Sequence, residues 1–321
     1  MKQLLFLATL LFAHFVHAQE AAPAPAPEAA PAPAAATDAT DASLILGAAD
    51  GYADNNGVKI HYVTLGQGPL LVFVHGFPDF WYSWRHQMKE LAKSYRCVAI
   101  DQRGFNLSDK PAGVENYRVE TLVTDVAAVI KACNADKATI IGHDWGGLVS
   151  WWFAANYPQM TERLIVCNLP HPKCLSRELA NNPEQQKMSQ YAQAFRRPDA
   201  GAAIQKDFLA TMPVGKDQAA FPAYRAAMAK SDIEAMLNYY KANYPAEPYQ
   251  EDPREVPHIK APTLVFHGLQ DPALHASGLN ETWQWIDNTL TIVTVPGAAH
   301  WVQEEAKDLV TSAIADWLKR N

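Results

Sequence analysis

Short apolar runs alternate with segments of helical spacing along residues 70–167. The runs have four or five residues each, as in strands buried on both faces of a parallel sheet; they are Leu70–Val74, Cys97–Ile100 and Leu164–Cys167. Between them, residues 83–93 and 119–133 place apolar side chains at the spacing of an amphipathic helix. This rhythm predicts a doubly wound, mostly parallel sheet with right-handed crossovers and helices on its faces.

The alternation of predicted strands and helices ends after residue 169. Residues 170–257 contain no apolar strand, and polar helical segments rich in Ala, Gln, Tyr and Met are separated there by prolines. We expect an inserted α-helical cap over the carboxyl edge of the sheet. Strand patterns resume at Thr263–His267 and Leu290–Val295, and an amphipathic helix is expected around residues 309–318. At the other end, Tyr52–Val63 with its Asn-Asn-Gly turn predicts an edge hairpin.

The first 47 residues differ from the rest of the chain. A positive start at Met1-Lys2, an apolar stretch Leu4–Val16 and the small-residue site Val16-His17-Ala18 are typical of a secretory signal peptide. An uncleaved anchor is the alternative for the same stretch. The expected organisation is a signal peptide at 1–18, an Ala/Pro-rich linker at 19–47, a first core part at 48–169, a cap at 170–257 and a second core part at 258–321. We therefore expect an exported, periplasmic or secreted protein with no stable membrane insertion after processing.

Composition narrows the possible partners. The chain has 321 residues and a net charge of −7, so it lacks the basic footprint of a nucleic-acid-binding protein. No Cys-x-x-Cys pair and no His-Glu-x-x-His motif occurs, so we expect no metal site and no cofactor. Of its four cysteines, Cys167 and Cys174 are close enough in sequence to pair, but sequence leaves that pairing and the oligomeric state open.

The stretch from Ala138 to Gly147 carries the chemistry. A β-favouring run enters the turn Gly142-His143-Asp144-Trp145-Gly146 and leaves as a helix, which is the setting of a nucleophile elbow. Here the central side chain is the carboxylate of Asp144. A carboxylate attacks an sp³ carbon to give an alkyl ester that a second step hydrolyses. Attack on an ester or amide carbonyl would give an anhydride, so esterase and peptidase activities are disfavoured.

The two late strands supply the partners that this carboxylate needs. Asp271 follows one strand and His300 the next, which completes the nucleophile–acid–base order of the α/β-hydrolases. His300 is expected to act as general base and Asp271 to orient it. Backbone N–H groups of Trp145 and Phe77 are the expected oxyanion hole. A ring-opening reaction also needs a proton donor, and the cap offers six tyrosines: Tyr191, Tyr224, Tyr239, Tyr240, Tyr244 and Tyr249.

The runs HGFPDFWYSWRHQM, DQRGFNLSD and GHDWGG resemble those of the α/β-hydrolase-fold epoxide hydrolases, and the similarity spans about residues 52–319. The resemblance implies an α/β-hydrolase fold, a mostly parallel sheet flanked by helices with an inserted α-helical cap. It implies Asp144 as nucleophile, Asp271 with His300 as the water-activating pair, and Tyr191 with Tyr240 as the clamp on the epoxide oxygen. A small hydrophobic epoxide and water are the implied partners. One departure is Asn106, which stands where a Gly is commoner and is expected to reshape the pocket edge without touching a catalytic role.

Other functions remain to be weighed. Haloalkane dehalogenases also use an Asp nucleophile, and Trp145 would suit a halide. Against them, Phe77 stands where many carry a halide-binding Asn, and their caps lack the tyrosine pair. Fluoroacetate dehalogenases place arginines beside the nucleophile, where this chain has Trp145 and Leu148. A binding protein on a hydrolase scaffold is disfavoured because every catalytic position is filled. The sequence does not identify the epoxide or the enantiomer preferred.

Overall fold

The computed structural model describes residues 41–215 and 217–321. These residues form one eight-stranded sheet in the order β1-β2-β4-β3-β5-β6-β7-β8. Strands β3 to β8 run parallel, and β1 and β2 are antiparallel additions at one edge. The strands are β1 Ala49–Asn55, β2 Val58–Leu65, β3 Leu70–Val74, β4 Arg96–Ile100, β5 Ala138–His143, β6 Thr161–Cys167, β7 Thr263–Gly268 and β8 Leu290–Val295. The prediction of a mostly parallel α/β-hydrolase sheet is confirmed, including the edge hairpin that turns at Asn56 and Gly57.

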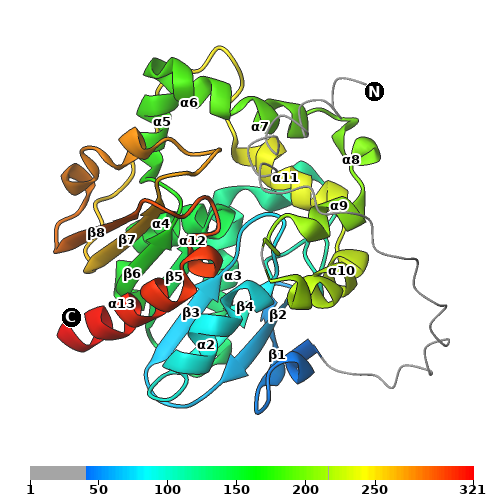
Figure 1. The fold of residues 1–321 in the computed structure, drawn as a ribbon, viewed down its shortest axis with the longest axis vertical. Helices are drawn as coiled ribbons and strands as arrows, with labels where there is room; N and C mark the ends of the chain where they lie inside the picture. The colour runs from blue at the N-terminus through cyan, green and yellow to red at the C-terminus, as the bar shows by residue number, and fades with distance from the viewer. Residues whose placement is uncertain (1–40, 216) are drawn as a thin grey trace, which may run out of the picture.

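Helices cover both faces of the sheet (Figure 1). The helix α2 (Arg85–Leu91) packs with α13 (Lys307–Arg320) on one face, and α3 (Val119–Ala132) packs with α4 (Trp145–Asn156) on the other. The short α12 (Val302–Glu305) precedes α13. Fully buried side chains of β3 to β7 fill the space between these layers, as a two-sided parallel sheet requires.

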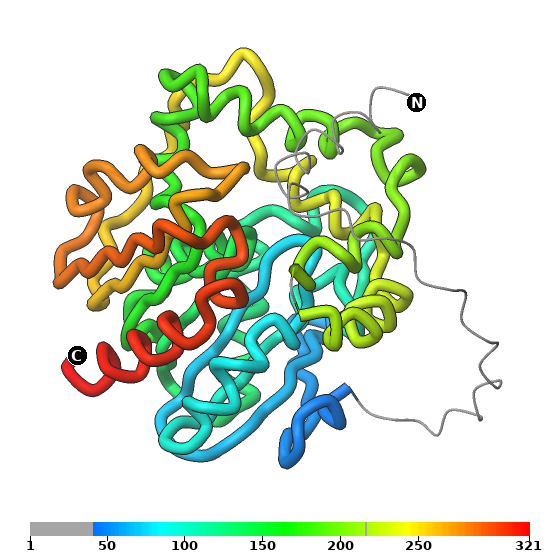
Figure 2. Tube along the Cα trace, viewed as in Figure 1, coloured from blue at the N-terminus to red at the C-terminus, as the bar shows by residue number. Residues whose placement is uncertain are grey.

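Between β6 and β7 the described chain forms no strand and folds into the helical cap (Figure 2). Its helices are α5 Pro172–Asn181, α6 Pro183–Met188, α7 Gln190–Phe195, α8 Ala200–Ala203, α9 Lys206–Thr211, α10 Phe221–Lys230 and α11 Ile233–Asn243. Asn182 and Asp232 cap the first turns of α6 and α11 with their side-chain oxygens. The cap thus has defined helix boundaries even where its helices are only one or two turns long.

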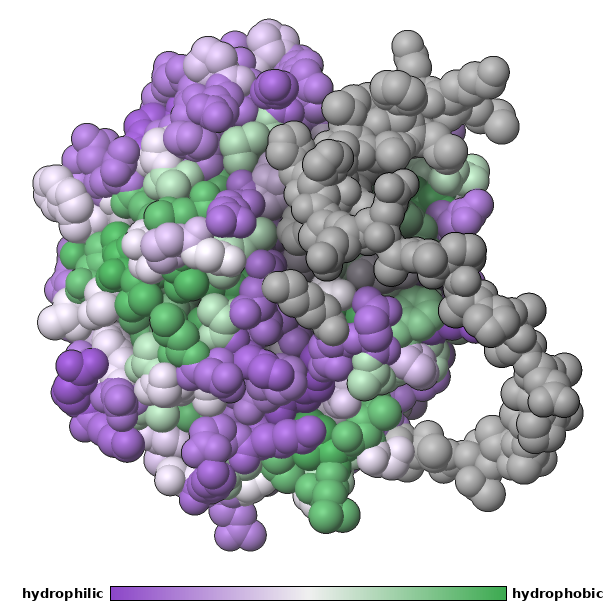
Figure 3. Space-filling view, viewed as in Figure 1, coloured by the Kyte–Doolittle hydropathy of each residue, from purple (hydrophilic) through white to green (hydrophobic). Residues whose placement is uncertain are grey.

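Some large apolar side chains remain at the surface of the described residues. On the face shown in Figure 3 hydrophilic side chains predominate, and hydrophobic ones gather where the β8 edge and α13 lie. Ile292 of β8 and Leu309 of α13 are among the large apolar side chains left partly exposed. Among the described residues, no helix is both long enough and apolar enough to cross a bilayer.

Residues 41–47, which we assign to the linker from sequence, lie against the hydrolase fold. Asp41–Leu44 forms a 3-10 helix, η1, and Ile45 is buried in the core. The expected signal peptide and the rest of the expected linker lie outside the described residues. The first described residue, Asp41, lies within a cluster of buried polar side chains.

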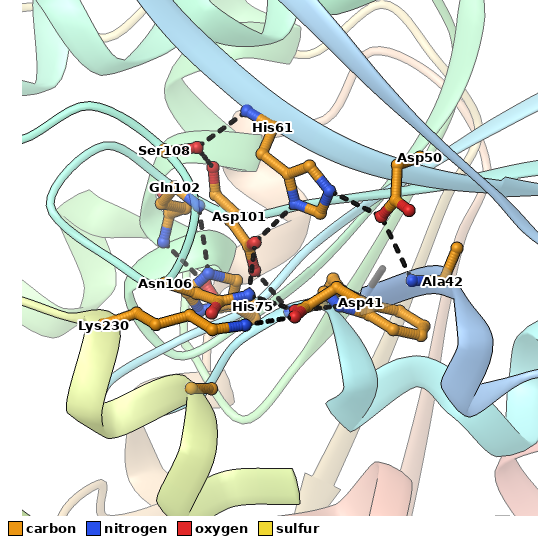
Figure 4. Close-up of polar contacts among 12 residues, drawn as sticks. Asp41, Ala42, Asp50, His61, His75, Asp101, Gln102, Asn106, Ser108 and Lys230 are labelled. Atoms are coloured by element: carbon orange, nitrogen blue, oxygen red, sulfur yellow. Dashed lines mark hydrogen bonds and ion pairs between the residues drawn. The ribbon is translucent and has the colours of Figure 1, made fainter. Parts of the chain in front are cut away.

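At the centre of that cluster, the fully buried His61 of β2 lies between two carboxylates (Figure 4). Its Nδ1 is 2.6 Å from Asp101 Oδ2 and its Nε2 is 2.9 Å from Asp50 Oδ1. Because a carboxylate only accepts, both ring nitrogens have to donate, which requires the imidazolium form. Burial disfavours the charged ring, but hydrogen bonds and charge from Asp101 and Asp50 outweigh burial and raise the pKa of His61.

We expect the free energy of unfolding to fall as the pH rises above about 6.5. Since folding raises the pKa of His61, its contribution is complete below the unfolded value near 6.5 and is lost through the folded one. His61→Gln should cost about 3–5 kcal/mol, because it leaves the buried Asp101 and the partly exposed Asp50 without their cation. Chemical denaturation at several pH values measures both effects. The exposed pair of His258 and Asp287 provides the control, and His258→Gln should change little. Equal losses in the two variants would contradict this role.

Candidate active site

Asp144 stands on a sharp turn between β5 and α4, as the sequence predicts. Its backbone has φ 51° and ψ −122°, a conformation that a side-chain-bearing residue rarely adopts. A Cβ at Gly142 would lie 2.3 Å from the Gly146 carbonyl oxygen, and one at Gly146 would lie 2.2 Å from that of Val74. The two glycines therefore permit the close packing of strand and helix that lifts Asp144 above the carboxyl edge of the sheet.

The Asp144 carboxylate is buried, with one oxygen held by backbone and the other facing a histidine. The Phe77 N–H donates to Oδ1 at 2.7 Å. His300 Nε2 lies 3.5 Å from Oδ2. The sequence prediction placed Phe77 in the oxyanion hole, and the structure puts its N–H on the candidate nucleophile. Trp145, the second expected donor, opens α4 directly after Asp144 and is 6% exposed.

His300 connects Asp144 to Asp271. Its Nδ1 is 2.9 Å from Asp271 Oδ2, so one ring nitrogen faces each carboxylate. The other Asp271 oxygen accepts from the Ala273 and Leu274 N–H groups at 2.7 and 3.1 Å. The structure thus brings together the three candidate residues that follow β5, β7 and β8, although 156 residues separate the first from the last.

The charges of Asp144, His300 and Asp271 stabilise one another. Burial opposes ionisation of Asp144, but the hydrogen bond and charge of His300 outweigh burial and lower the pKa of Asp144. Burial likewise opposes ionisation of Asp271, and His300 lowers the pKa of that carboxyl too. Burial alone would lower the pKa of His300, yet Asp271 and Asp144 raise it well above 6.5. The resting site therefore holds two carboxylates and an imidazolium between them.

Two cap tyrosines face Asp144 across a cavity of about 440 Å³. Tyr191 of α7 and Tyr240 of α11 both line it, with ring centroids 6.1 Å apart. Tyr240 also packs edge-on against Trp145, at 4.8 Å between centroids. Burial raises the pKa of both phenols well above 10, and Asp144 contributes to both shifts. Both hydroxyls are therefore neutral donors at physiological pH.

The remaining cavity wall is largely apolar, and its mouth is charged. Apolar side chains from the core and the cap line it, among them Leu148, Trp152, Leu175, Leu179 and Leu274. Arg254 covers the face of Trp152, with Cζ 4.9 Å from the ring centroid, and pairs with Asp252. Asn106 is not among the lining residues, so the expectation that it reshapes the pocket edge is not met.

Two further residues were missed by the sequence analysis. Asn168, directly after β6, donates from Nδ2 to Asp271 Oδ2 at 2.6 Å and to the Ala299 carbonyl at 3.1 Å. Its position at a strand's carboxyl end, between the strands of Asp144 and Asp271, is the signal that could have identified it. Asp79 is the other: burial, then Glu304, raises its pKa to about 8, and its Oδ2 accepts from the Trp301 indole at 2.9 Å.

The described residues offer no metal site: no group of three or more His, Cys, Asp or Glu side chains there could hold an ion. All four cysteines are free and buried, so Cys167 and Cys174 do not pair in this structure. Acid–base and nucleophilic side chains are the chemistry that this site displays.

Comparisons with known proteins identify a family and several relatives of this chain. A family model described as alpha/beta hydrolase fold matches residues 69–307. The chain is 36% identical over 290 residues to Epoxide hydrolase 1 of Caenorhabditis elegans, covering 82% of this chain and 68% of that protein. It is 34% identical to the AB hydrolase superfamily protein YfhM of Bacillus subtilis, covering 84% and 97%. An epoxide hydrolase of Bacillus megaterium in complex with an inhibitor superposes with a TM-score of 0.77 at 31% identity, covering 84% of this chain and all of that one.

Proposed function

This chain belongs to the epoxide hydrolases of the α/β-hydrolase fold, and from that premise we propose that it opens an epoxide to a vicinal diol through an ester on Asp144. The observation that carries the proposal is the Asp144 carboxyl group, which lies between the Phe77 N–H and His300 and lines the same cavity as Tyr191 and Tyr240. A substrate with an sp³ carbon to attack and an alkoxide leaving group matches both parts of this arrangement. The carboxylate attacks the carbon, and the phenols donate to the departing oxygen. An acyl substrate would leave the tyrosines without a role.

In the first step, Asp144 Oδ2 attacks one epoxide carbon and the C–O bond to that carbon breaks. The departing oxygen takes a proton from Tyr191 or Tyr240, which line the same cavity as Asp144. The Phe77 N–H holds Oδ1, so the carboxylate is oriented before the substrate arrives. The product of this step is a hydroxyalkyl ester of Asp144.

In the second step, water attacks the ester carbonyl carbon and His300 takes its proton. Ester formation removes the Asp144 charge, which is one of the causes that raise the pKa of His300. Loss of that charge lowers the pKa of His300, so the imidazolium gives up its proton, which restores the phenol of the tyrosine, and the neutral imidazole can then take a proton from water. The Phe77 N–H stabilises the oxyanion that forms on Oδ1, and Asp271 stabilises the imidazolium. Collapse releases the diol and regenerates the carboxylate.

The substrate is expected to be a small hydrophobic epoxide. A cavity of about 440 Å³ with largely apolar walls suits a compact aryl or alkyl group, and Asp144, Tyr191 and Tyr240 are among its lining residues. Catalysis by Asp144, His300 and the tyrosines needs no cofactor. Which epoxide and which enantiomer are preferred depends on the shape of this cavity.

A single turnover in heavy-oxygen water tests the ester. With enzyme in excess, the Asp144 carboxylate should gain label while the first diol stays unlabelled, because water attacks the carbonyl carbon of the ester and not the substrate. Mass spectrometry of the peptide and the diol measures both. His300→Gln should accumulate the ester, since attack proceeds while hydrolysis lacks its base. Label in the first diol would show direct attack by water and overturn the proposal.

The tyrosine pair separates epoxide opening from dehalogenation. Positioned proton donors typically contribute about 10²–10⁴-fold in rate, so Tyr191→Phe and Tyr240→Phe should each slow ester formation and the double change should nearly abolish it. Rapid-mixing measurement of alkylation decides this. Tyr249→Phe is the matched control, since its hydroxyl contacts Gln193 and lies outside the cavity lining. Unchanged alkylation in the double variant, with halide release from a haloalkane, would favour a dehalogenase that uses the same Asp144.

We also propose that the protein is exported, on the strength of the signal-like pattern in residues 1–18. Expressed in a bacterium, the processed protein should be recovered outside the cytoplasm with an N-terminus near Gln19. Fractionation followed by N-terminal sequencing checks this. Retention of Met1 in a membrane fraction would support the uncleaved anchor instead.

A further inference from the structure

Asn106 joins the loop after β4 to Asp41 and to the cap, which are both far from it in sequence. Asn106 is buried in the loop after β4 and has a positive φ of 39°, the region that favours Gly. Its backbone N–H donates to Ser231 Oγ of the cap at 2.8 Å. Its Nδ2 donates to Asp101 Oδ2 at 2.8 Å and to Asp41 Oδ2 at 2.5 Å. The side chain that distinguishes this loop from a Gly-containing one therefore forms bonds that Gly could not.

Asp41 is the residue on which these contacts converge (Figure 4). It precedes β1 and is 8% exposed. Besides Asn106, its Oδ2 accepts from the Trp81 indole at 3.2 Å. Its Oδ1 accepts from Lys230 Nζ at 2.6 Å. One carboxylate thus serves three donors, from the core, from the loop after β4 and from the cap.

The contacts that join the cap to Asp41 and to the loop after β4, which we call the junction, lie directly before α11. Lys230 ends α10, and Ser231 and Asp232 connect it to α11. Asp232 caps α11 through the Ala235 N–H and donates its own N–H to the Gly104 carbonyl at 3.2 Å. Further along, the Tyr239 hydroxyl donates to the Arg103 carbonyl at 2.9 Å. The start of α11 is therefore attached to the loop after β4, and Tyr240 lies roughly 12 Å beyond it along the helix.

The core side leads toward Phe77. Asp101 Oδ1 accepts the Trp81 N–H at 3.0 Å. Gln102 donates its N–H to His75 Nε2 at 3.0 Å and its Nε2 to the His75 carbonyl at 2.6 Å. These bonds hold the segment that carries Phe77, and none of them involves Asp41. Loss of the Asp41 carboxylate would therefore remove its bonds to Lys230, Asn106 and the Trp81 indole, while the bonds around Phe77 that do not involve Asp41 remain.

We propose that Asp41 is a positioning residue for ring opening, because it holds the junction of α10 and α11 against the core and thereby sets Tyr240 opposite Asp144. The inference rests on the proposed function, in which Tyr240 supplies a proton to the epoxide oxygen. A residue ahead of the hydrolase fold would then control the first chemical step without touching the substrate. Misplacement of a reacting group by about 1 Å can cost about 10²-fold in rate.

The test compares full-length variants with styrene oxide as the probe. Asp41→Asn keeps the size of the side chain but sets an amide N–H₂ against donors, and Lys230→Met removes the cation and keeps an apolar chain. We expect Asp41→Asn to slow alkylation per active site by about tenfold or more, with ester hydrolysis nearly unchanged. Lys230→Met should act in the same direction, and the double variant should be no slower than Asp41→Asn alone. Burst amplitudes count the active sites, so partial unfolding does not mimic the effect.

The matched control is Asp199→Asn, which breaks an exposed cap ion pair with Arg197 and should leave both steps unchanged. Equal slowing of both steps, or no slowing of alkylation by Asp41→Asn, would overturn the positioning role.

Hydrogen exchange of residues 231–243 gives a readout that needs no substrate, and Asp41→Asn should speed it. If wild type forms no ester but exchange responds to Asp41→Asn, the proposed reaction is wrong and the junction stands. Unchanged exchange with unchanged alkylation rejects the junction itself.

Discussion

The requirement that a buried carboxylate stay ionised is the constraint on which this structure depends. Burial on its own disfavours the charged form of Asp144, and a protonated acid would be a poor nucleophile. The charge survives because the Phe77 N–H and His300 both face it. Those partners follow β3 and β8, so the sheet has to bring the ends of several strands together before the charge is stabilised. The site is a property of the whole sheet edge.

Attachment of the cap poses a different problem, because apolar packing alone allows helices to shift by small amounts. Buried hydrogen bonds between charged groups have definite directions, and leaving one unpaired is costly. The cluster around Asp41, Asp101 and His61 contains such bonds where the cap meets the core. Its members come from η1, β2, the loop after β4 and the end of α10. A polar junction of this kind selects one placement of the cap from many that would bury similar apolar area.

Much of this architecture could be predicted from sequence because it depends on local patterns. Continuous apolar runs predict β3 to β7, and the Asn-Asn-Gly turn predicts the β1–β2 hairpin. Asp144, Asp271 and His300 could be found because each follows a predicted strand. Asn168 occupies an equivalent position, but an isolated Asn has no motif to mark it. The burial of Asp41 could not be predicted, since its partner Lys230 is 189 residues away and its neighbours resemble a linker. The raised pKa of Asp79 likewise depends on burial that only the fold creates.

In the proposed reaction, the choice of tyrosine as proton donor follows from the same constraint on Asp144. A lysine or histidine in that place would carry a positive charge, pair with Asp144 and tie up the carboxylate that has to attack. A carboxylic acid would share its proton with Asp144 and repel it when ionised. A phenol avoids both outcomes, because burial and the nearby Asp144 charge raise the pKa of Tyr240 and keep it neutral. It can still stabilise negative charge as that charge develops on a departing oxygen. A cap that presents neutral donors is therefore compatible with an ionised nucleophile beneath it.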